Sequence, residues 1–441
     1  MRNPSEVFGS EHLPDRLSDA ELIERYRRSG GDPEELIYLS LGESWTGSPA
    51  GLREALSGAV PEYAHGYTLS PYGFPALRDV LRRYIVTTHE LLPEPDVRTD
   101  YEVAVSSNGT RDAMFDFGRL LCATAGEREG DKIALLPNPG WDYSGVFEPL
   151  GFRVLPYDVS EADAYRPDVD SVVRLLDVSR KSCPQAQLLL ILNPQHNPTG
   201  ADWGDEAVRQ LIRAALRNRV ALLIDDAFYA VHDPDTVPTN TVEILLAESA
   251  RSEVGSRFPW LAVRTLGKQF HCNGWGIGAL TAHPETLRGL VRQVHHHAYG
   301  AAVPLQAAMA GWMGDPASAS YLETLRCDYA AKRTHVARRL VSELGYPKHA
   351  GFPGDCTSYV RLRVPERFLC FSDPAATYRG RCLHDAGVLL GEGSMVPIHH
   401  GSDSVSKHVR LYLGPKRFEL DSAMDRILEA GLGWAEPTPT K

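Results

Sequence analysis

The sequence predicts an α/β fold, with a mostly parallel sheet covered by helices on both faces and a smaller α+β domain. Seven short apolar runs alternate with helical stretches in the middle of the chain. That alternation is typical of parallel strands joined by crossover helices. After about residue 310 the pattern changes to helices with shorter strands. The seven expected strands are residues 101–106, 132–136, 152–157, 187–192, 220–224, 260–265 and 277–282.

Elements outside this region indicate how the smaller domain is built. Ser18-Asp19-Ala20-Glu21 forms a capping box, and Leu17 and Leu22 are spaced as a hydrophobic staple, so a helix is expected to begin there. Residues 35–41 read as a strand, as do 357–363 and 409–413. We therefore predict an N-terminal arm and part of the small domain (1–70), a large domain (71–305) and a C-terminal small domain (306–441).

Composition narrows the possible partners. The 441-residue chain is 43% hydrophobic and 23% charged, as is usual for a globular protein of two domains. A net charge of −11 argues against a nucleic-acid partner. The seven cysteines lack C-x-x-C spacing, which disfavours a disulfide framework or structural zinc site. With no apolar leader and no run long enough to cross a bilayer, we expect a cytoplasmic protein without a membrane partner.

Chemically apt segments follow the expected strands in a particular order. They are Asn108-Gly109-Thr110, Pro139-Gly140-Trp141, His196-Asn197-Pro198-Thr199-Gly200, Asp225-Asp226, Thr265-Leu266-Gly267-Lys268 and, far downstream, Arg410. In open parallel sheets, ligands bind at the carboxyl ends of the strands. Almost all of these segments fall on such ends, so together they predict one ligand site.

This ordered set resembles the fold-type I pyridoxal-phosphate (PLP) enzymes, specifically the class I/II aminotransferase family, along nearly the whole chain. The resemblance implies the aminotransferase fold, PLP as cofactor, an α-amino acid as substrate and a homodimer with shared active sites. It implies that Lys268 forms an imine with the cofactor aldehyde and later moves the substrate α-proton. A partly desolvated lysine near a cation suits that work.

The partner of the cofactor ring nitrogen is open between two residues. The family has an Asp at the end of this strand and a Tyr three positions later that bonds the phenolic oxygen. Asp225 would pair with Phe228, whereas Asp226 would pair with Tyr229. Because the apolar run ends directly before Asp225, we favour Asp225 as the catalytic carboxylate and keep Tyr229 as a cofactor-binding candidate.

Other cofactor and substrate contacts follow from the same resemblance. Asn197 would donate to the phenolic oxygen and lie near the substrate, and Trp141 would cover the cofactor ring. Gly109, Thr110 and Arg111, at the start of a helix, and Thr265 would hold the phosphate. Tyr67 would reach the phosphate of a partner subunit. Gly42 would close over the substrate, and Arg410 would bind its α-carboxylate bidentately.

The chain departs from the family at one position. The family has a phosphate-binding Arg eight residues after the lysine, where this sequence has Gly276. Arg111, Arg264 or His271 could replace it, with Arg111 first because it lies at the phosphate end. Alternatively, the missing side chain makes room for a large substrate.

Two further motifs are not expected to carry function. Gly274-Trp275-Gly276-Ile277-Gly278 precedes a strand and so does not fit a dinucleotide fingerprint. Consecutive residues of His295-His296-His297 diverge on a helix, so no metal site is expected. The resemblance implies that this region lies near the cofactor of a partner subunit, where His297 or Tyr299 could line the pocket.

The predicted function is an aminotransferase-like reaction on an α-amino acid. The alternative is elimination, replacement, cyclisation or oxidation of an amino acid in natural-product metabolism on the same scaffold. A non-catalytic regulator that keeps the fold is a more distant possibility.

Overall fold

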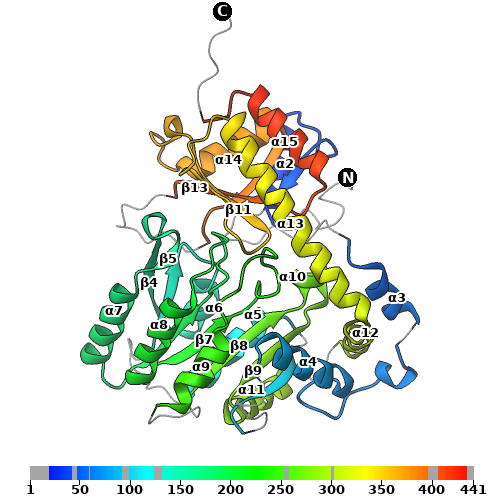
Figure 1. Cartoon of the computed structure of the whole chain (residues 1–441), viewed down its shortest axis with the longest axis vertical. Coiled ribbons are helices and arrows are strands. Elements are labelled where there is room, and N and C mark those ends of the chain that lie inside the picture. Colours follow the sequence, from blue (N-terminus) through cyan, green and yellow to red (C-terminus); the bar gives the residue numbers. More distant parts are fainter. Residues whose placement is uncertain are drawn as a thin grey trace, which may run out of the picture.

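The computed structural model describes residues 19–41, 47–58, 60–91, 99–106, 108–123, 132–252, 258–298, 302–395 and 406–434. Figure 1 shows a large sheet with its helices in the lower part and a smaller sheet above it. The long helix α13 (Pro316–Ser342) runs between the two. No helix in these ranges is long and apolar enough to span a bilayer.

The large sheet contains all seven predicted strands, which confirms the α/β fold class. Its order is β2-β9-β8-β7-β6-β3-β4-β5. An eighth strand, β5, has only two residues, too few to leave a periodic pattern in the sequence. Strands β9 and β5 run antiparallel to their neighbours, and the other pairings are parallel. The strands are β2 (Glu102–Ser106), β3 (Lys132–Asn138), β4 (Arg153–Ser160), β5 (Arg166–Pro167), β6 (Gln187–Leu192), β7 (Ala221–Asp225), β8 (Trp260–Thr265) and β9 (Gly278–Ala282).

Helices cover both faces of this sheet because its strands are apolar on both sides. In β6, Leu188 and Leu190 pack into one core, whereas Leu189 and Ile191 pack into the other. The first core is covered by α4 (Pro75–Thr88), α7 (Val169–Ser182), α8 (Asp205–Arg217), α9 (Thr241–Ala250) and α12 (Val303–Gly314). The second is covered by α5 (Thr110–Cys122), α6 (Ser144–Phe147) and α11 (Pro284–His297).

The smaller sheet joins the two ends of the chain. Its order is β1-β12-β13-β11-β10, with strands β1 (Ile37–Leu39), β10 (Gly351–Phe352), β11 (Tyr359–Arg363), β12 (Val388–Glu392) and β13 (His408–Tyr412). It packs with α13, α14 (Pro374–Ala386) and α15 (Arg417–Glu429). Helix α2 (Asp19–Arg28) begins where the capping box predicted a helix, although Ser18 lies outside the described residues.

Candidate active site

Lys268 projects from a single rigid turn. It lies in α10 (Gly267–Phe270), directly after β8. The Gly267 N–H donates to the Thr265 hydroxyl at 3.2 Å. A Cβ atom at Gly267 would lie 2.5 Å from the Asn273 side-chain oxygen, so only glycine fits there. The ammonium nitrogen of Lys268 is 5.6 Å from the centre of the Phe228 ring. The fixed turn and the half-buried position suit a lysine that must hold one geometry.

Asp225 is a buried carboxylate at the end of β7. The Tyr143 hydroxyl donates to its Oδ2 at 2.7 Å, and the Ala227 N–H donates to its Oδ1 at 3.2 Å. Burial raises the pKa of Asp225 to about 6, although the Tyr143 hydrogen bond and the Lys268 charge oppose that shift. A buried carboxyl that ionises so reluctantly gains most from a cation beside it. Asp225 therefore suits a protonated ring nitrogen.

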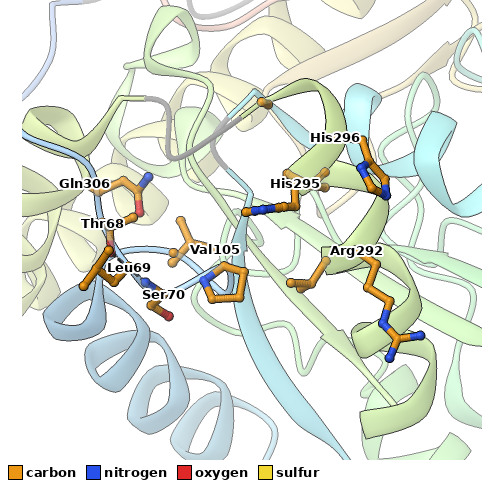
Figure 2. A pocket seen from close by; sticks show the side chains of 13 residues that line it. Thr68, Leu69, Ser70, Val105, Arg292, His295, His296 and Gln306 are labelled. Atoms are coloured by element: carbon orange, nitrogen blue, oxygen red, sulfur yellow. Dashed lines mark hydrogen bonds between the residues drawn. The ribbon is translucent and has the colours of Figure 1, made fainter.

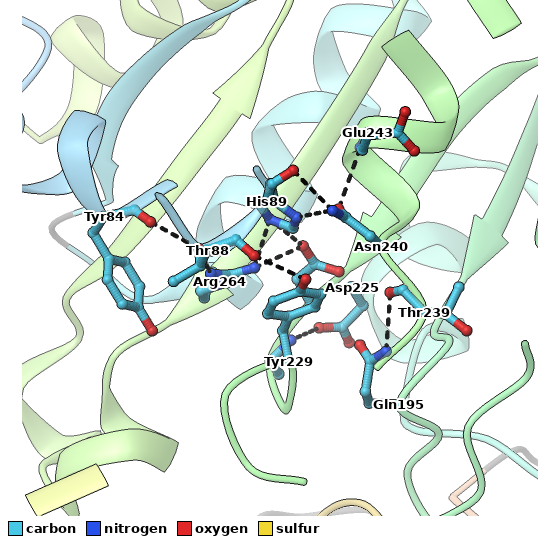
Figure 3. A network of polar contacts seen from close by, with 12 residues as sticks. Tyr84, Thr88, His89, Gln195, Asp225, Tyr229, Thr239, Asn240, Glu243 and Arg264 are labelled. Carbon is cyan, nitrogen blue, oxygen red and sulfur yellow. Dashed lines mark hydrogen bonds and ion pairs between the residues drawn. The ribbon is translucent and has the colours of Figure 1, made fainter. Parts of the chain in front are cut away.

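Asp226 faces a different set of partners, and Figure 3 labels Arg264, His89 and Asn240 of that network. Arg264 Nη2 lies 3.3 Å from Asp226 Oδ2 and donates to His89 Nε2 at 2.6 Å. His89 Nδ1 in turn lies 2.6 Å from the Asn240 side-chain oxygen. Burial alone would raise the pKa of Asp226, but His89 and the positive charge of Arg264 outweigh it and lower that pKa. Asp226 is thus committed to a structural ion pair, which leaves Asp225 as the carboxylate available to a ligand.

Tyr229 lies with the Asp226 network rather than with Lys268. Its hydroxyl donates to the Thr88 carbonyl at 3.0 Å, and its ring lies 4.3 Å beneath the Arg264 guanidinium. The ring near Lys268 belongs to Phe228, three residues after Asp225. The geometry gives no support to the predicted cofactor contact of Tyr229.

Asn197 and Arg410 meet although they are 213 residues apart in the chain. Arg410 Nη1 donates to the Asn197 side-chain oxygen at 2.8 Å, and its guanidinium lies 3.9 Å from the centre of the Tyr359 ring. The contact leaves the Asn197 amide hydrogens free to face a ligand. It also sets Arg410 beside the loop that follows β6, as a carboxylate-binding residue requires.

Asn193 and Tyr143 are two site residues that the sequence did not indicate. Asn193 Oδ1 accepts the Asn197 N–H at 2.8 Å, and its Nδ2 donates to the Asp225 carbonyl at 2.8 Å. Asn193 therefore ties the Asn197 loop to the end of β7. The position of Asn193 directly after an apolar strand is a signal that could have identified it, whereas Tyr143 had none.

The backbone of Gly276 contacts the predicted phosphate-binding loop at Gly109. The Gly109 N–H donates to the Gly276 carbonyl at 2.6 Å. Both glycines have positive φ values, 87° and 62°. A Cβ atom at Gly276 would lie 3.2 Å from the Gly109 nitrogen and 3.3 Å from the Asn108 carbonyl carbon. The missing side chain has thus let two backbone segments come together, and it does not open room for a large substrate.

Arg111 is the one of three suggested substitutes that remains at the phosphate end. Its guanidinium lies 4.2 Å over the Trp141 ring and 3.1 Å from Asp142 Oδ2. Arg264 is held by Asp226 and His89, as described above. His271 contacts tyrosine hydroxyls on α13 through both ring nitrogens, at 2.7 and 3.1 Å.

Thr110 and Thr265 are both close neighbours of Gly278. Ser106 and Thr265 are both register partners of Gly278, because β9 lies between β2 and β8. A Cβ atom at Gly278 would lie 3.1 Å from Thr110 Cγ2 and 3.3 Å from Thr265 Cα. The start of α5 and the loop of Lys268 are therefore neighbours. A helix start with two hydroxyls suits a phosphate.

Tyr67 is 76% exposed, and the adjacent Leu69 is 92% exposed. Both residues line one pocket, and Leu69 also lines a second pocket, which Figure 2 shows between this segment and the end of α11. That pocket has a volume of about 530 Å³. Tyr67 lines one of these pockets beside Phe74 and Val303. Gly42 and Tyr299 lie outside the described residues.

His297 lies within reach of two carboxylates, Asp112 and Asp116, whose oxygens could join it as metal ligands. Asp116 already pairs with His297 Nε2 at 2.9 Å and with Arg119 Nη1 at 3.3 Å. The cationic Arg119 would oppose a metal ion there.

Comparisons with known proteins identify the family of the chain. The sequence model of the family "Aminotransferase class I and II" matches residues 52–427. The 4-dedimethylamino-4-oxo-anhydrotetracycline transaminase OxyQ of Streptomyces rimosus is 26% identical, over 74% of this chain and 79% of that protein. The probable N-succinyldiaminopimelate aminotransferase DapC of Mycobacterium tuberculosis is 24% identical, over 68% of this chain and 67% of that protein.

Solved structures share the fold. A double mutant of Thermus thermophilus aspartate aminotransferase has a TM-score of 0.74 at 21% identity, covering 98% of this chain and 100% of that one. Substrate-bound BacF from Bacillus subtilis has a TM-score of 0.75 at 20% identity, covering 97% and 100%.

Proposed function

Because the chain belongs to the aminotransferase class I and II family, we propose that it transfers the amino group of an α-amino acid to a 2-oxo acid. The contact between Arg410 and Asn197 carries this proposal. It supports the proposal because Arg410, which would bind the substrate carboxylate, contacts Asn197, and Asn193 ties the Asn197 loop to the end of β7 at Asp225. The second carboxylate at this strand end, Asp226, is held by Arg264 and His89, and we assign it a structural role.

The enzyme is a PLP-dependent transferase, and the residues present fit the cofactor. When bound, PLP supplies an electron sink for the charge that develops at the substrate α-carbon. Asp225, with its pKa raised to about 6 by burial, would hold the protonated ring nitrogen. Thr110, Thr265 and Arg111, with the start of α5, would hold the phosphate. Trp141 would cover the ring and Asn197 would donate to the phenolic oxygen.

The chain's own groups would then position the substrate and move one proton. Arg410 would grip the α-carboxylate with two parallel N–H groups, which fixes the α-carbon relative to Lys268. The Lys268 amine would remove the proton from the substrate α-carbon and would deliver it to the C4′ carbon of the cofactor.

A second copy of the chain would complete the site. Tyr67 and Leu69 present apolar surface to solvent in the single chain, next to the pocket of Figure 2. A contiguous apolar surface of this kind favours a protein partner. We propose that it is covered by an identical subunit and that Tyr67 reaches the partner's phosphate site.

One experiment separates this proposal from its rivals. The visible absorbance of the purified protein, wild type and Lys268→Ala, is recorded with PLP and then with amino acids, with and without a 2-oxo acid. Transamination predicts a cofactor band that the variant lacks and multiple turnovers only when the 2-oxo acid is present. Continued turnover without it would favour elimination, cyclisation or oxidation. Failure to take up PLP would contradict the proposal.

A further inference from the structure

Arg361 on β11 directly faces Arg410 on β13 across the antiparallel pair. Directly opposed residues project from the same face, with Cβ atoms about 4.5–5.5 Å apart. Both side chains are buried, with 6% and 3% of their surface exposed. Like charges in such a position destabilise a strand pair unless something neutralises them.

Neither guanidinium has an ion-pair partner in the part of the chain that the structure describes. Arg410 contacts the neutral Asn197, and Arg361 lies 4.8 Å from the centre of the Tyr165 ring. The acid that acts on Arg361 is Glu161, but its carboxylate lies 3.6 Å from His408 instead. The Nε atoms of both arginines are buried without a hydrogen-bond partner. Two unpaired donors on one face indicate a site for anions.

Arg361 also lies close to the residues of the candidate active site. Burial, and then the positive charge of Arg361, lower the pKa of His196 to about 3. His196 directly precedes Asn197, which Arg410 contacts. Arg361 and Arg410, which are register partners, therefore act on the neighbouring residues His196 and Asn197 of the loop after β6. A ligand carboxylate on Arg410 would leave the charge of Arg361 uncompensated.

We propose that Arg361 is a specificity-determining residue that, together with Arg410, selects substrates carrying a second carboxylate. The substrate class is a dicarboxylic amino acid or a dicarboxylic 2-oxo acid acceptor. The inference rests on the proposed function, in which Arg410 holds the α-carboxylate. A carboxylate can meet the guanidinium with charge-assisted hydrogen bonds, whereas an amide of equal size leaves the buried charge unpaired.

The test compares ligands that differ in charge but scarcely in size. L-Glutamate is paired with L-glutamine, L-aspartate with L-asparagine, and 2-oxoglutarate with 2-oxoglutaramate. Dissociation constants are measured from the cofactor absorbance, on the PLP-loaded protein for the amino acids and on the protein loaded with pyridoxamine phosphate for the 2-oxo acids. They are measured independently from the rise in thermal midpoint that each ligand produces. The variants are Arg361→Met, which keeps length without charge, and Arg361→Lys, which keeps the charge.

Wild type is expected to bind the acid of at least one pair about tenfold or more tighter than its amide, as one charge-assisted contact allows. The Met variant should lose that preference while its affinity for the amide changes less than about threefold. The Lys variant should retain part of it. The donor and acceptor pairs show which substrate supplies the second carboxylate.

If the Met variant lost affinity for the acid and for the amide equally, the inference would be overturned, because Arg361 would then only pack between the strands. A wild type that binds acid and amide equally would overturn it even if the Met variant failed to fold. Failure of the proposed function would look different, since amino acids would then turn over without a 2-oxo acid or would leave the cofactor absorbance unchanged.

Discussion

The carbonyl oxygen of Gly276 accepts the backbone N–H of Gly109 across 2.6 Å, which joins the Lys268 loop to the start of α5. The position where the family has a phosphate-binding arginine is therefore filled by backbone. Gly276 has a φ of 62°, and a Cβ atom there would press on the Gly109 nitrogen at 3.2 Å.

Gly276→Ala is expected to lower the free energy of unfolding by roughly 1–2 kcal/mol, because a left-handed backbone and a tight contact both penalise a side chain. The change in the free energy of unfolding is measured by urea unfolding of the variant and of the wild type. Gly274→Ala is the control, since nothing lies within 4 Å of its added Cβ atom. Equal effects at both positions would contradict the tight contact.

Asp225 should make the stability of the cofactor-free protein fall as the pH rises from about 4 to about 6. Burial raises the pKa of Asp225 from 3.8 to about 6, so the folded state holds the proton more tightly than the unfolded chain does. The loss should approach about 3 kcal/mol above that window. Asp225→Asn should flatten the dependence, as followed by urea midpoints across the pH range. An unchanged profile would show that Asp225 does not titrate there.

Asp226 should behave in the opposite way. Its pKa is lowered, so its stabilising contribution is present above the ordinary value and is lost as the pH falls through the folded-state pKa. Asp226→Asn leaves the Arg264 charge buried without its ion pair, at a cost of about 3–5 kcal/mol in the free energy of unfolding. Comparison with Arg264→Met and the double variant gives the coupling energy. Additive effects would rule out the ion pair.

Arg410→Lys should weaken amino-acid binding roughly ten- to hundredfold, because a single ammonium cannot reproduce the two parallel N–H groups of a guanidinium. The cofactor absorbance should stay unchanged, since Arg410 is not expected to touch the cofactor. Spectral titration with an amino acid measures the effect. Arg363→Lys, two residues from Arg361 on the same strand, is the control and should bind normally.

Leu69→Glu should convert a dimer into monomers, because it places a charge in the apolar surface beside Tyr67. Light scattering at several concentrations measures the mass. Val237→Glu is matched to it, since Val237 is 91% exposed but lies far along the chain beside another pocket. A wild-type monomer would contradict the proposed assembly.

The sequence predicted the fold well because apolar runs report directly on buried strands. All seven long strands appear within three residues of their expected bounds, whereas β5 is too short to leave such a signal. The family and its cofactor were also predictable from the order of the motifs. The division into domains at residues 70 and 305 stays a prediction, as do the roles of the individual site residues.

Contacts between distant segments could not be read from the sequence. The local sequence around Tyr143 does not show that its hydroxyl donates to Asp225. The local sequence around Arg361 does not show that this residue faces Arg410. The spacing of Asp226 and Tyr229 matched the family's pattern, yet the structure turns both toward Arg264. A local pattern fixes which residues are near one another in the chain but not which face of a strand end they occupy.

The position of β9 has a consequence for synthesis of the chain. Among the described strands β2 pairs with β9 alone, and Ser106 is the register partner of Gly278. A ribosome adding about 5–20 residues per second would make β2 roughly 9 to 34 seconds before β9 begins to be made. The start of α5 and the Lys268 loop therefore cannot come together until both have been made, so the proposed phosphate-binding residues are among the last parts of the large sheet to assemble.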